Sequence, residues 1–86
     1  MPDEPLCNVV LFNDDETTME FVVNAFQRFI GVDYDGANKL MLRIHHEGKA
    51  VCGTYAREQA EATAASIQAF ADAHNQSLEC VLEEAR

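Results

Sequence analysis

The stretch Val9-Val10-Leu11-Phe12-Asn13-Asp14-Asp15-Glu16-Thr17-Thr18-Met19-Glu20-Phe21 decides the fold. Its first four residues are apolar β-formers, whose number and composition suit a buried strand. Four polar residues follow, three of them acidic, and a helix begins at once, because Thr17 and Glu20 have the spacing of a capping box. We therefore predict a strand-to-helix turn at residues 13–16, called the acidic turn below. Binding groups are often held on such turns between rigid elements.

Composition limits the possible functions. The 86 residues are 48% hydrophobic, which suits one small domain with a single core. The net charge of −9 repels phosphate backbones and anionic lipids, so we expect neither nucleic-acid nor membrane binding. Without a membrane-spanning run or a secretory signal, the protein is expected to be cytoplasmic. Cys7, Cys52 and Cys80 are expected to be core thiols in a reducing compartment rather than a disulfide or metal set.

The remaining patterns predict the order strand, helix, helix, strand, helix, strand. The predicted strands are 7–12, 49–55 and 78–83, and the predicted helices are 18–30, 36–47 and 57–75. Asp35 is expected to cap the second helix, and Gly31 and Gly48 to end the first two. Helices packed on one side of a three-stranded antiparallel sheet make a two-layer α/β (α+β) sandwich. Residues 1–6 are expected to form a short flexible arm, and residues 7–86 a single domain.

The acidic turn has several possible interpretations. It suits a solvated loop whose acids complement the dipole of the following helix. A calcium loop of the EF-hand type fails on spacing, because the sixth position from Asn13 is Thr18 rather than glycine and the twelfth is Asn24 rather than glutamate. A phosphatase motif fails because Asn13 stands where an aspartate nucleophile is needed. We therefore expect no catalytic residue, metal or other cofactor, while the solvated loop and a binding site remain open.

Four segments together resemble the ClpS family of bacterial protease adaptors. The first is Asn-Asp-Asp-x-Thr-x-Met-Glu-Phe-Val at residues 13–22, and the others are residues 40–45, 48–53 and 78–83. The resemblance covers nearly the whole chain from about residue 7. It implies a non-enzymatic adaptor that binds N-degrons, proteins with N-terminal Leu, Phe, Tyr or Trp. The adaptor would deliver them to the ClpA-type AAA+ unfoldase of the ClpAP protease.

The resemblance also implies which residues form the site. The α-amino group of the substrate would be surrounded by Asn13, Asp14, Asp15 and His45. The first side chain would enter a pocket lined by Thr17, Met19, Val22, Met41, Ile44 and Leu78. The chemistry agrees, because a free α-amino group is largely a cation with three donors, and these polar side chains can offer acceptors. Ile44 stands where many relatives carry valine, so we expect a narrower pocket that disfavours Trp.

The surface implied for delivery departs from the family pattern. Glu58 matches the acidic member of the unfoldase-docking pair on the third helix, but Thr63 stands at the basic position. Relatives also carry a longer N-terminal extension than the residues that precede the first strand here. We therefore expect intact recognition and less secure delivery. The alternatives are a general peptide- or protein-interaction domain without N-terminal selectivity and, more remotely, a phosphatase-like hydrolase.

Overall fold

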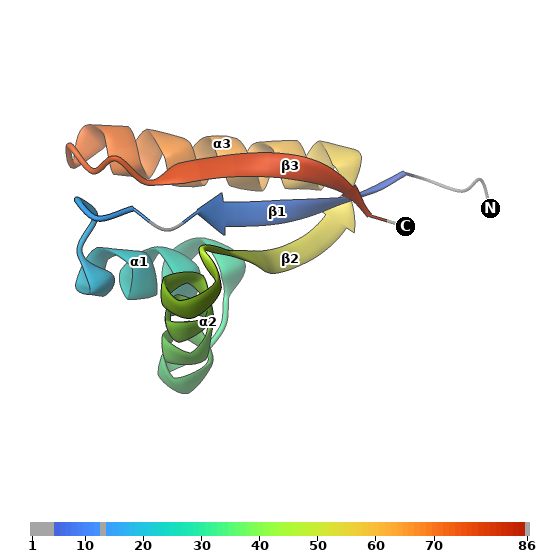
Figure 1. The fold of residues 1–86 in the computed structure, drawn as a ribbon. Coiled ribbons are helices and arrows are strands. Elements are labelled where there is room, and N and C mark those ends of the chain that lie inside the picture. Colours follow the sequence, from blue (N-terminus) through green and yellow to red (C-terminus); the bar gives the residue numbers. More distant parts are fainter. Residues whose placement is uncertain (1–4, 13, 86) are drawn as a thin grey trace.

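The computed structural model describes residues 5–12 and 14–85, which contain the three helices and three strands in the predicted order (Figure 1). The strands are β1 (Leu6–Phe12), β2 (Lys49–Ala56) and β3 (Glu79–Ala85). The helices are α1 (Met19–Ala25) with its π-helical continuation η1 (Phe26–Ile30), α2 (Tyr34–Glu47) and α3 (Arg57–Ala73). Within these described residues, no helix is both long and apolar enough to cross a bilayer. Most of the predicted arm lies outside the described residues, and β1 begins one residue earlier than expected.

β1 is the central strand of an antiparallel sheet with the order β2-β1-β3. Its core-facing residues alternate along the strand and are at most 2% exposed: Cys7, Val9 and Leu11. α3 lies along one face of the sheet (Figure 1). Its buried residues include two alanines, Ala60 and Ala71, whose small side chains let the helix lie close to the strands. The central strand of the sheet therefore supplies Cys7, Val9 and Leu11 to the hydrophobic core.

β2 contains a β-bulge that the sequence pattern does not predict. Val9 pairs with Gly53 and Val10 with Val51, which leaves Cys52 as the extra residue on β2. A bulge shifts the alternation of side chains by one residue. Both ends of β2 therefore present side chains to the same core.

The first helix begins one residue later than its sequence signature suggests. Thr18 is the N-cap, because its backbone is extended and its Oγ1 accepts a 3.1 Å hydrogen bond from the Phe21 amide. The predicted capping residue, Thr17, is wrong in this role, since its hydroxyl donates elsewhere, within the acidic turn. The helix therefore starts immediately after a turn that has its own hydrogen bonds.

The second helix is capped by Asp33 rather than by Asp35. The Oδ1 atom of Asp33 accepts a 2.8 Å hydrogen bond from the Gly36 amide, and its extended backbone suits an N-cap, whereas Asp35 lies inside the first turn. The predicted ends of the first two helices are confirmed. Gly31 and Gly48 have φ values of 89° and 88°, in the left-handed region that favours glycine at these positions.

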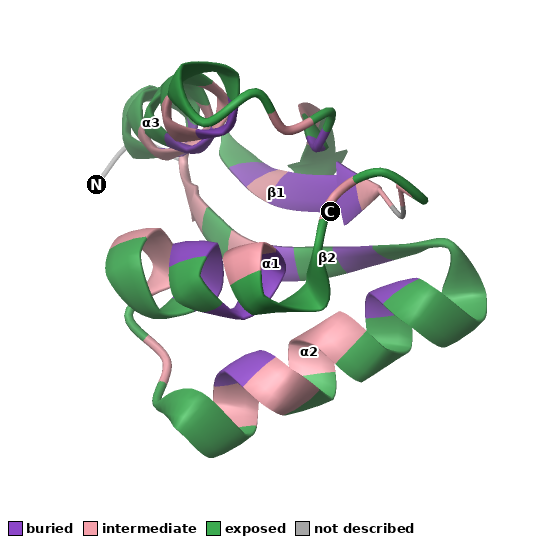
Figure 2. Ribbon diagram, turned by 90° about the vertical axis from the view of Figure 1, so that its left-hand side faces the viewer, coloured by how far each residue is buried: buried purple, intermediate pink, exposed green. Residues whose placement is uncertain are grey.

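Aromatic contacts join α1 and η1 to α3. The Phe21 and Phe70 rings stack with centroids 4.8 Å apart, and Phe29 meets Phe70 edge-on at 5.3 Å. α2 packs against α1 and the β2 edge of the sheet, and the buried residues of both helices form short bands in Figure 2. This packing fixes the start of α1 next to the last turn of α2.

Candidate functional site

Eight of the ten residues predicted to bind substrate line one small cavity. They are Asp14, Thr17, Met19, Val22, Met41, Ile44, His45 and Leu78. The cavity volume is about 30 Å³, which is room for one or two water molecules. Phe12 also lines the cavity. Sequence reasoning missed Phe12 because it assigned this residue to the strand, although its position directly before the acidic turn was a usable signal.

Two other predicted residues, Asp15 and Glu58, do not line the cavity. Asp15 is exposed and is not among the described residues that line the cavity. Asn13 lies outside the described residues. Glu58 is exposed in the first turn of α3, where it lines a separate hollow with Pro5 and Arg57. The predicted docking residue is therefore not part of the cavity.

The carboxylate of Asp14 is held by two neighbours in the turn. Its Oδ1 accepts a 3.1 Å hydrogen bond from the Glu16 amide, and its Oδ2 accepts a 2.7 Å hydrogen bond from the Thr17 hydroxyl. Aspartate commonly organises a turn through bonds to residues two or three positions later. A carboxylate oxygen has more than one lone pair, so both oxygens keep acceptor capacity. Asp14 therefore presents a fixed negative charge at the cavity.

The loop between α3 and β3, although distant in sequence, makes hydrogen bonds to the acidic turn and to the start of α1. The Thr18 amide donates a 3.3 Å hydrogen bond to Oε1 of Gln76, and the Ser77 hydroxyl donates a 3.0 Å hydrogen bond to Oε1 of Glu16. The chain can reach these positions because Asn75 takes a φ of 57°, which ends α3 and redirects the backbone. Sequence reasoning missed Gln76 and Ser77, and no local pattern marks them.

Gln68 of α3 fixes the cavity wall formed by Leu78. Its Nε2 donates a 3.0 Å hydrogen bond to the Leu78 carbonyl, and its Oε1 accepts a 3.3 Å hydrogen bond from the Cys80 amide. Leu78 is only 2% exposed. One side-chain amide thus satisfies two backbone groups and sets where β3 begins.

α2 contributes three residues from one side of its last two turns. Met41 and Ile44 are three residues apart and Met41 and His45 four apart, which places them on the same helix face. Ile44 is buried, whereas His45 is exposed beside the cavity, with its ring centroid 5.7 Å from that of His46. Met19 of α1 is 53% exposed, so one wall of the cavity is a flexible side chain in contact with water.

Two thiols have shifted pKa values, and both lie away from the cavity lining. Burial raises the pKa of Cys52 to about 12, with a smaller contribution from the nearby Cys80 thiol. Burial also raises the pKa of Cys80 to about 11. Both are therefore neutral thiols near pH 7, which makes them structural residues rather than nucleophiles.

The lining of the cavity combines apolar walls with a carboxylate and an imidazole. Val22, Ile44 and Leu78 offer a surface for an apolar group, and the two methionines can adapt to its shape. Asp14 and His45 can accept hydrogen bonds from a donor-rich head group. The arrangement suits a ligand with a compact apolar body and a cationic end.

Comparison with known proteins agrees with these features. The family model for the ATP-dependent Clp protease adaptor protein ClpS matches residues 2–81. The ClpS adapter proteins of Sodalis glossinidius and Vibrio atlanticus are 47% and 43% identical over 77 residues, which are 90% of this chain and 73% of each relative. The fold is similar to that of Agrobacterium tumefaciens ClpS2 bound to L-phenylalaninamide, with a TM-score of 0.94 and 26% identity over 96% of this chain and 100% of that one. This chain belongs to the ClpS family of ATP-dependent Clp protease adaptor proteins.

Proposed function

We propose that this adaptor binds proteins with a free N-terminal Leu, Phe, Tyr or Trp and delivers them to the ClpA-type unfoldase of the ClpAP protease. One observation carries the proposal. The cavity joins apolar walls to a fixed carboxylate and an exposed imidazole, which are complementary to an apolar first side chain and its α-amino group. The solved ClpS2 structure supports it, because phenylalaninamide has both a phenyl side chain and a free α-amine.

In this proposal, the polar residues of the cavity recognise the α-amino group. Asp14 supplies a charged acceptor whose orientation is fixed, and His45 supplies an imidazole nitrogen as a second acceptor. Asp15, which is exposed and follows Asp14 in the chain, is proposed to act through water or through the field of its charge. Asn13 is proposed to add an amide oxygen. An acetylated terminus has neither the charge nor the donors, so these acceptors would be left unpaired.

The first side chain is recognised by the apolar walls. The cavity of about 30 Å³ is smaller than a leucine or phenylalanine side chain, so binding requires the lining to open. Met19 can move at little cost because it is half exposed and unbranched. Phe12, Val22, Ile44 and Leu78 then provide the walls that bury the apolar group.

Delivery is proposed to use a different surface, around Glu58. Glu58 is exposed at the start of α3 and lines a hollow apart from the cavity, so docking there would leave the substrate site free. Glu58→Gln should slow ATP-dependent degradation of a Phe-starting reporter by ClpAP without changing the affinity for a Phe-starting peptide. Equal loss of peptide binding would argue against separate surfaces.

The decisive experiment compares a Phe-starting peptide with its N-acetylated twin by fluorescence anisotropy. We expect the free amine to bind and the acetylated form to lose most of its affinity. Asp15→Asn should weaken binding of the peptide with the free amine. Asp35→Asn is the matched control, because Asp35 is an exposed aspartate on α2, and it should leave this affinity unchanged. Equal binding of the two peptides would instead support a peptide-interaction domain without N-terminal selectivity.

A further inference from the structure

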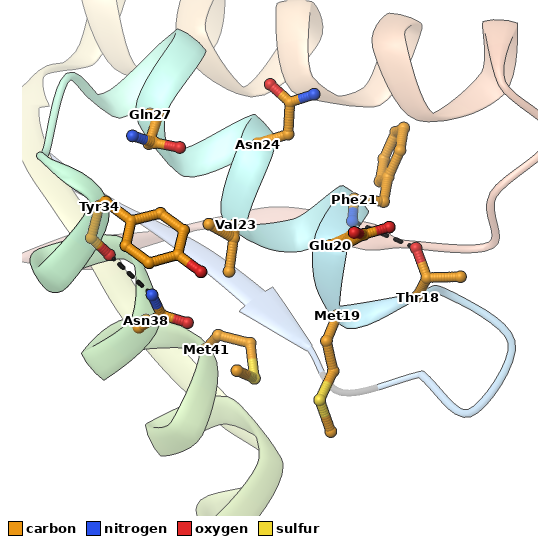
Figure 3. Close-up of a pocket in the computed structure, with 10 residues that line it drawn as sticks. All are labelled: Thr18, Met19, Glu20, Phe21, Val23, Asn24, Gln27, Tyr34, Asn38 and Met41. Atoms are coloured by element: carbon orange, nitrogen blue, oxygen red, sulfur yellow. Dashed lines mark hydrogen bonds between the residues drawn. The ribbon is translucent and has the colours of Figure 1, made fainter.

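A second, much larger groove lies between α1 and α2 (Figure 3). Its volume is about 700 Å³, against about 30 Å³ for the cavity described above. It is lined by Thr18, Met19, Glu20, Phe21, Val23, Asn24, Gln27, Tyr34, Asn38 and Met41. Met19 and Met41 line both the groove and the cavity. The two spaces therefore adjoin at the two methionines.

The groove offers the hydrogen-bonding groups that an extended backbone needs. Three side-chain amides line it, those of Asn24, Gln27 and Asn38, and each amide carries both donors and an acceptor. Asn24 and Gln27 are exposed, and their side chains make no hydrogen bond within the described part of the chain. Asn38 donates to the Tyr34 carbonyl at 3.0 Å, which leaves its own oxygen as an acceptor. These amides can pair with peptide N–H and C=O groups whatever the sequence.

An exposed aromatic ring provides an apolar surface in the same groove. Tyr34 is 64% exposed, and Figure 3 shows its ring extending from α2 toward Val23 of α1, with Met41 close by. A tyrosine that is apolar along its ring and polar at its hydroxyl is typical of binding surfaces. This surface can cover the side chain of a residue that follows the first.

Glu20 is the one charged residue among the described residues that line the groove. A carboxylate at this place attracts a cationic side chain and repels an acidic one. We propose that the groove holds the second to fourth residues of the bound chain in an extended conformation, and that Glu20 favours a basic residue among them. This inference rests on the proposed function, which it extends from the first residue to those that follow.

A comparison of ligand lengths tests the groove itself. Binding of phenylalaninamide and of a Phe-starting tetrapeptide is measured for Gln27→Ala, Tyr34→Ala and the matched control Gln59→Ala, an exposed glutamine on α3. The two groove variants should weaken binding of the tetrapeptide about two- to tenfold, as expected for one lost interaction. Their affinity for phenylalaninamide should be unchanged. The control should change neither ligand. Equal effects on both ligands, or none on the tetrapeptide, would overturn the proposal.

A comparison of charges tests the role of Glu20. Tetrapeptides that begin with Phe-Lys or Phe-Glu are titrated against the wild type, Glu20→Gln and Glu84→Gln. Glu84→Gln is the control, because it removes the same charge at the far end of β3. The preference for lysine should shrink by up to about fivefold in Glu20→Gln and stay unchanged in the control. An equal change in both variants would assign the preference to net charge and contradict the proposed role.

Binding of phenylalaninamide distinguishes failure of this inference from failure of the proposed function. If phenylalaninamide itself does not bind, the proposed function fails and this inference fails with it. If it binds and the later residues have no effect on affinity, only this inference fails.

Discussion

The Thr17 hydroxyl donates a 2.7 Å hydrogen bond to Oδ2 of Asp14. Both residues line the cavity, so the threonine has two effects, one as part of the wall and one through the orientation of the carboxylate. The second effect was not part of the sequence prediction, which gave Thr17 a place in the side-chain pocket and the role of helix cap. In the proposed function, Thr17 thus connects recognition of the side chain with recognition of the amine.

Thr17→Val should weaken binding of a Phe-starting peptide about tenfold. Valine keeps the shape of threonine but removes the hydrogen bond that fixes the Asp14 carboxylate, and bonds to charged groups contribute about 1.5–3 kcal/mol. Fluorescence anisotropy gives the dissociation constant, and Thr17→Ser should restore most of the affinity. Thr54→Val is a matched control, because it removes a 2.7 Å hydrogen bond to Asn8 on the sheet, away from the cavity. Equal losses in Thr17→Val and Thr54→Val would contradict the assignment.

Gln76→Ala should loosen the start of α1. The Thr18 amide then loses its acceptor, and we expect faster amide hydrogen exchange at Thr18 and a loss of about 0.5–1.5 kcal/mol in the local opening free energy. Affinity for a Phe-starting peptide should fall only a few-fold, since the cavity lining is unchanged. Gln59→Ala, on the exposed face of α3, serves as the control. Unchanged exchange at Thr18 would show that Gln76 does not anchor the turn.

The sequence predicted the features that depend on neighbouring residues. The order of elements follows from periodicity, and the glycine ends of the helices follow from the left-handed backbone at Gly31 and Gly48. The cavity residues came from the resemblance to a family rather than from periodicity, and the structure brings most of them together. Local sequence patterns therefore predicted the order of helices and strands, and the resemblance predicted which residues this fold brings to the cavity.

The features that the sequence did not predict depend on contacts between distant segments. Gln68 binds backbone groups at the start of β3, and Gln76 binds the amide of Thr18, the N-cap of α1. These contacts depend on how α3 and the loop after it lie against the rest of the fold. The bulge at Cys52 is set by pairing with β1. The capping error at Thr17 has a local origin instead. Thr17 and Thr18 carry equivalent hydroxyl groups, but the Thr17 hydroxyl donates to the Asp14 carboxylate three residues earlier, so Thr18 caps the helix.

The free energy of unfolding should fall as the pH rises above about 9. Burial raises the pKa of Cys52 to about 12 and that of Cys80 to about 11, whereas unfolded thiols ionise near pH 8.5. The unfolded state therefore loses its thiol protons first, and the stabilisation present below pH 8.5 is lost as the pH approaches the folded values. Denaturant titrations measure the free energy of unfolding at pH 8 and at pH 10.5. Its fall between the two pH values should be about 1–2 kcal/mol smaller in Cys52→Ala than in the wild type. An equal fall in both proteins would show that Cys52 is not responsible.

The identity of residue 44 should control which first residues are accepted. Ile44 is 4% exposed and lines the cavity, and isoleucine fills more of it than the valine expected from the family pattern. We expect a Phe-starting peptide to bind more tightly than a Trp-starting one, because one methylene in an apolar pocket changes discrimination by about 1–3 kcal/mol. Competition titrations with the two peptides measure the ratio directly, and equal affinities in the wild type would refute the expectation.

Ile44→Val should bring the two affinities closer by about fivefold or more, since it removes one methylene from the pocket. It should also cost about 0.5–1.5 kcal/mol of stability, as is usual for this change in a core. Ile67→Val is the matched control, because Ile67 is fully buried in α3 and does not line the cavity. The control should carry a similar stability cost and leave the Phe-to-Trp ratio unchanged. A shift of the ratio in both variants would mean that selectivity follows overall stability, whereas a shift in Ile44→Val alone would assign selectivity to the cavity wall.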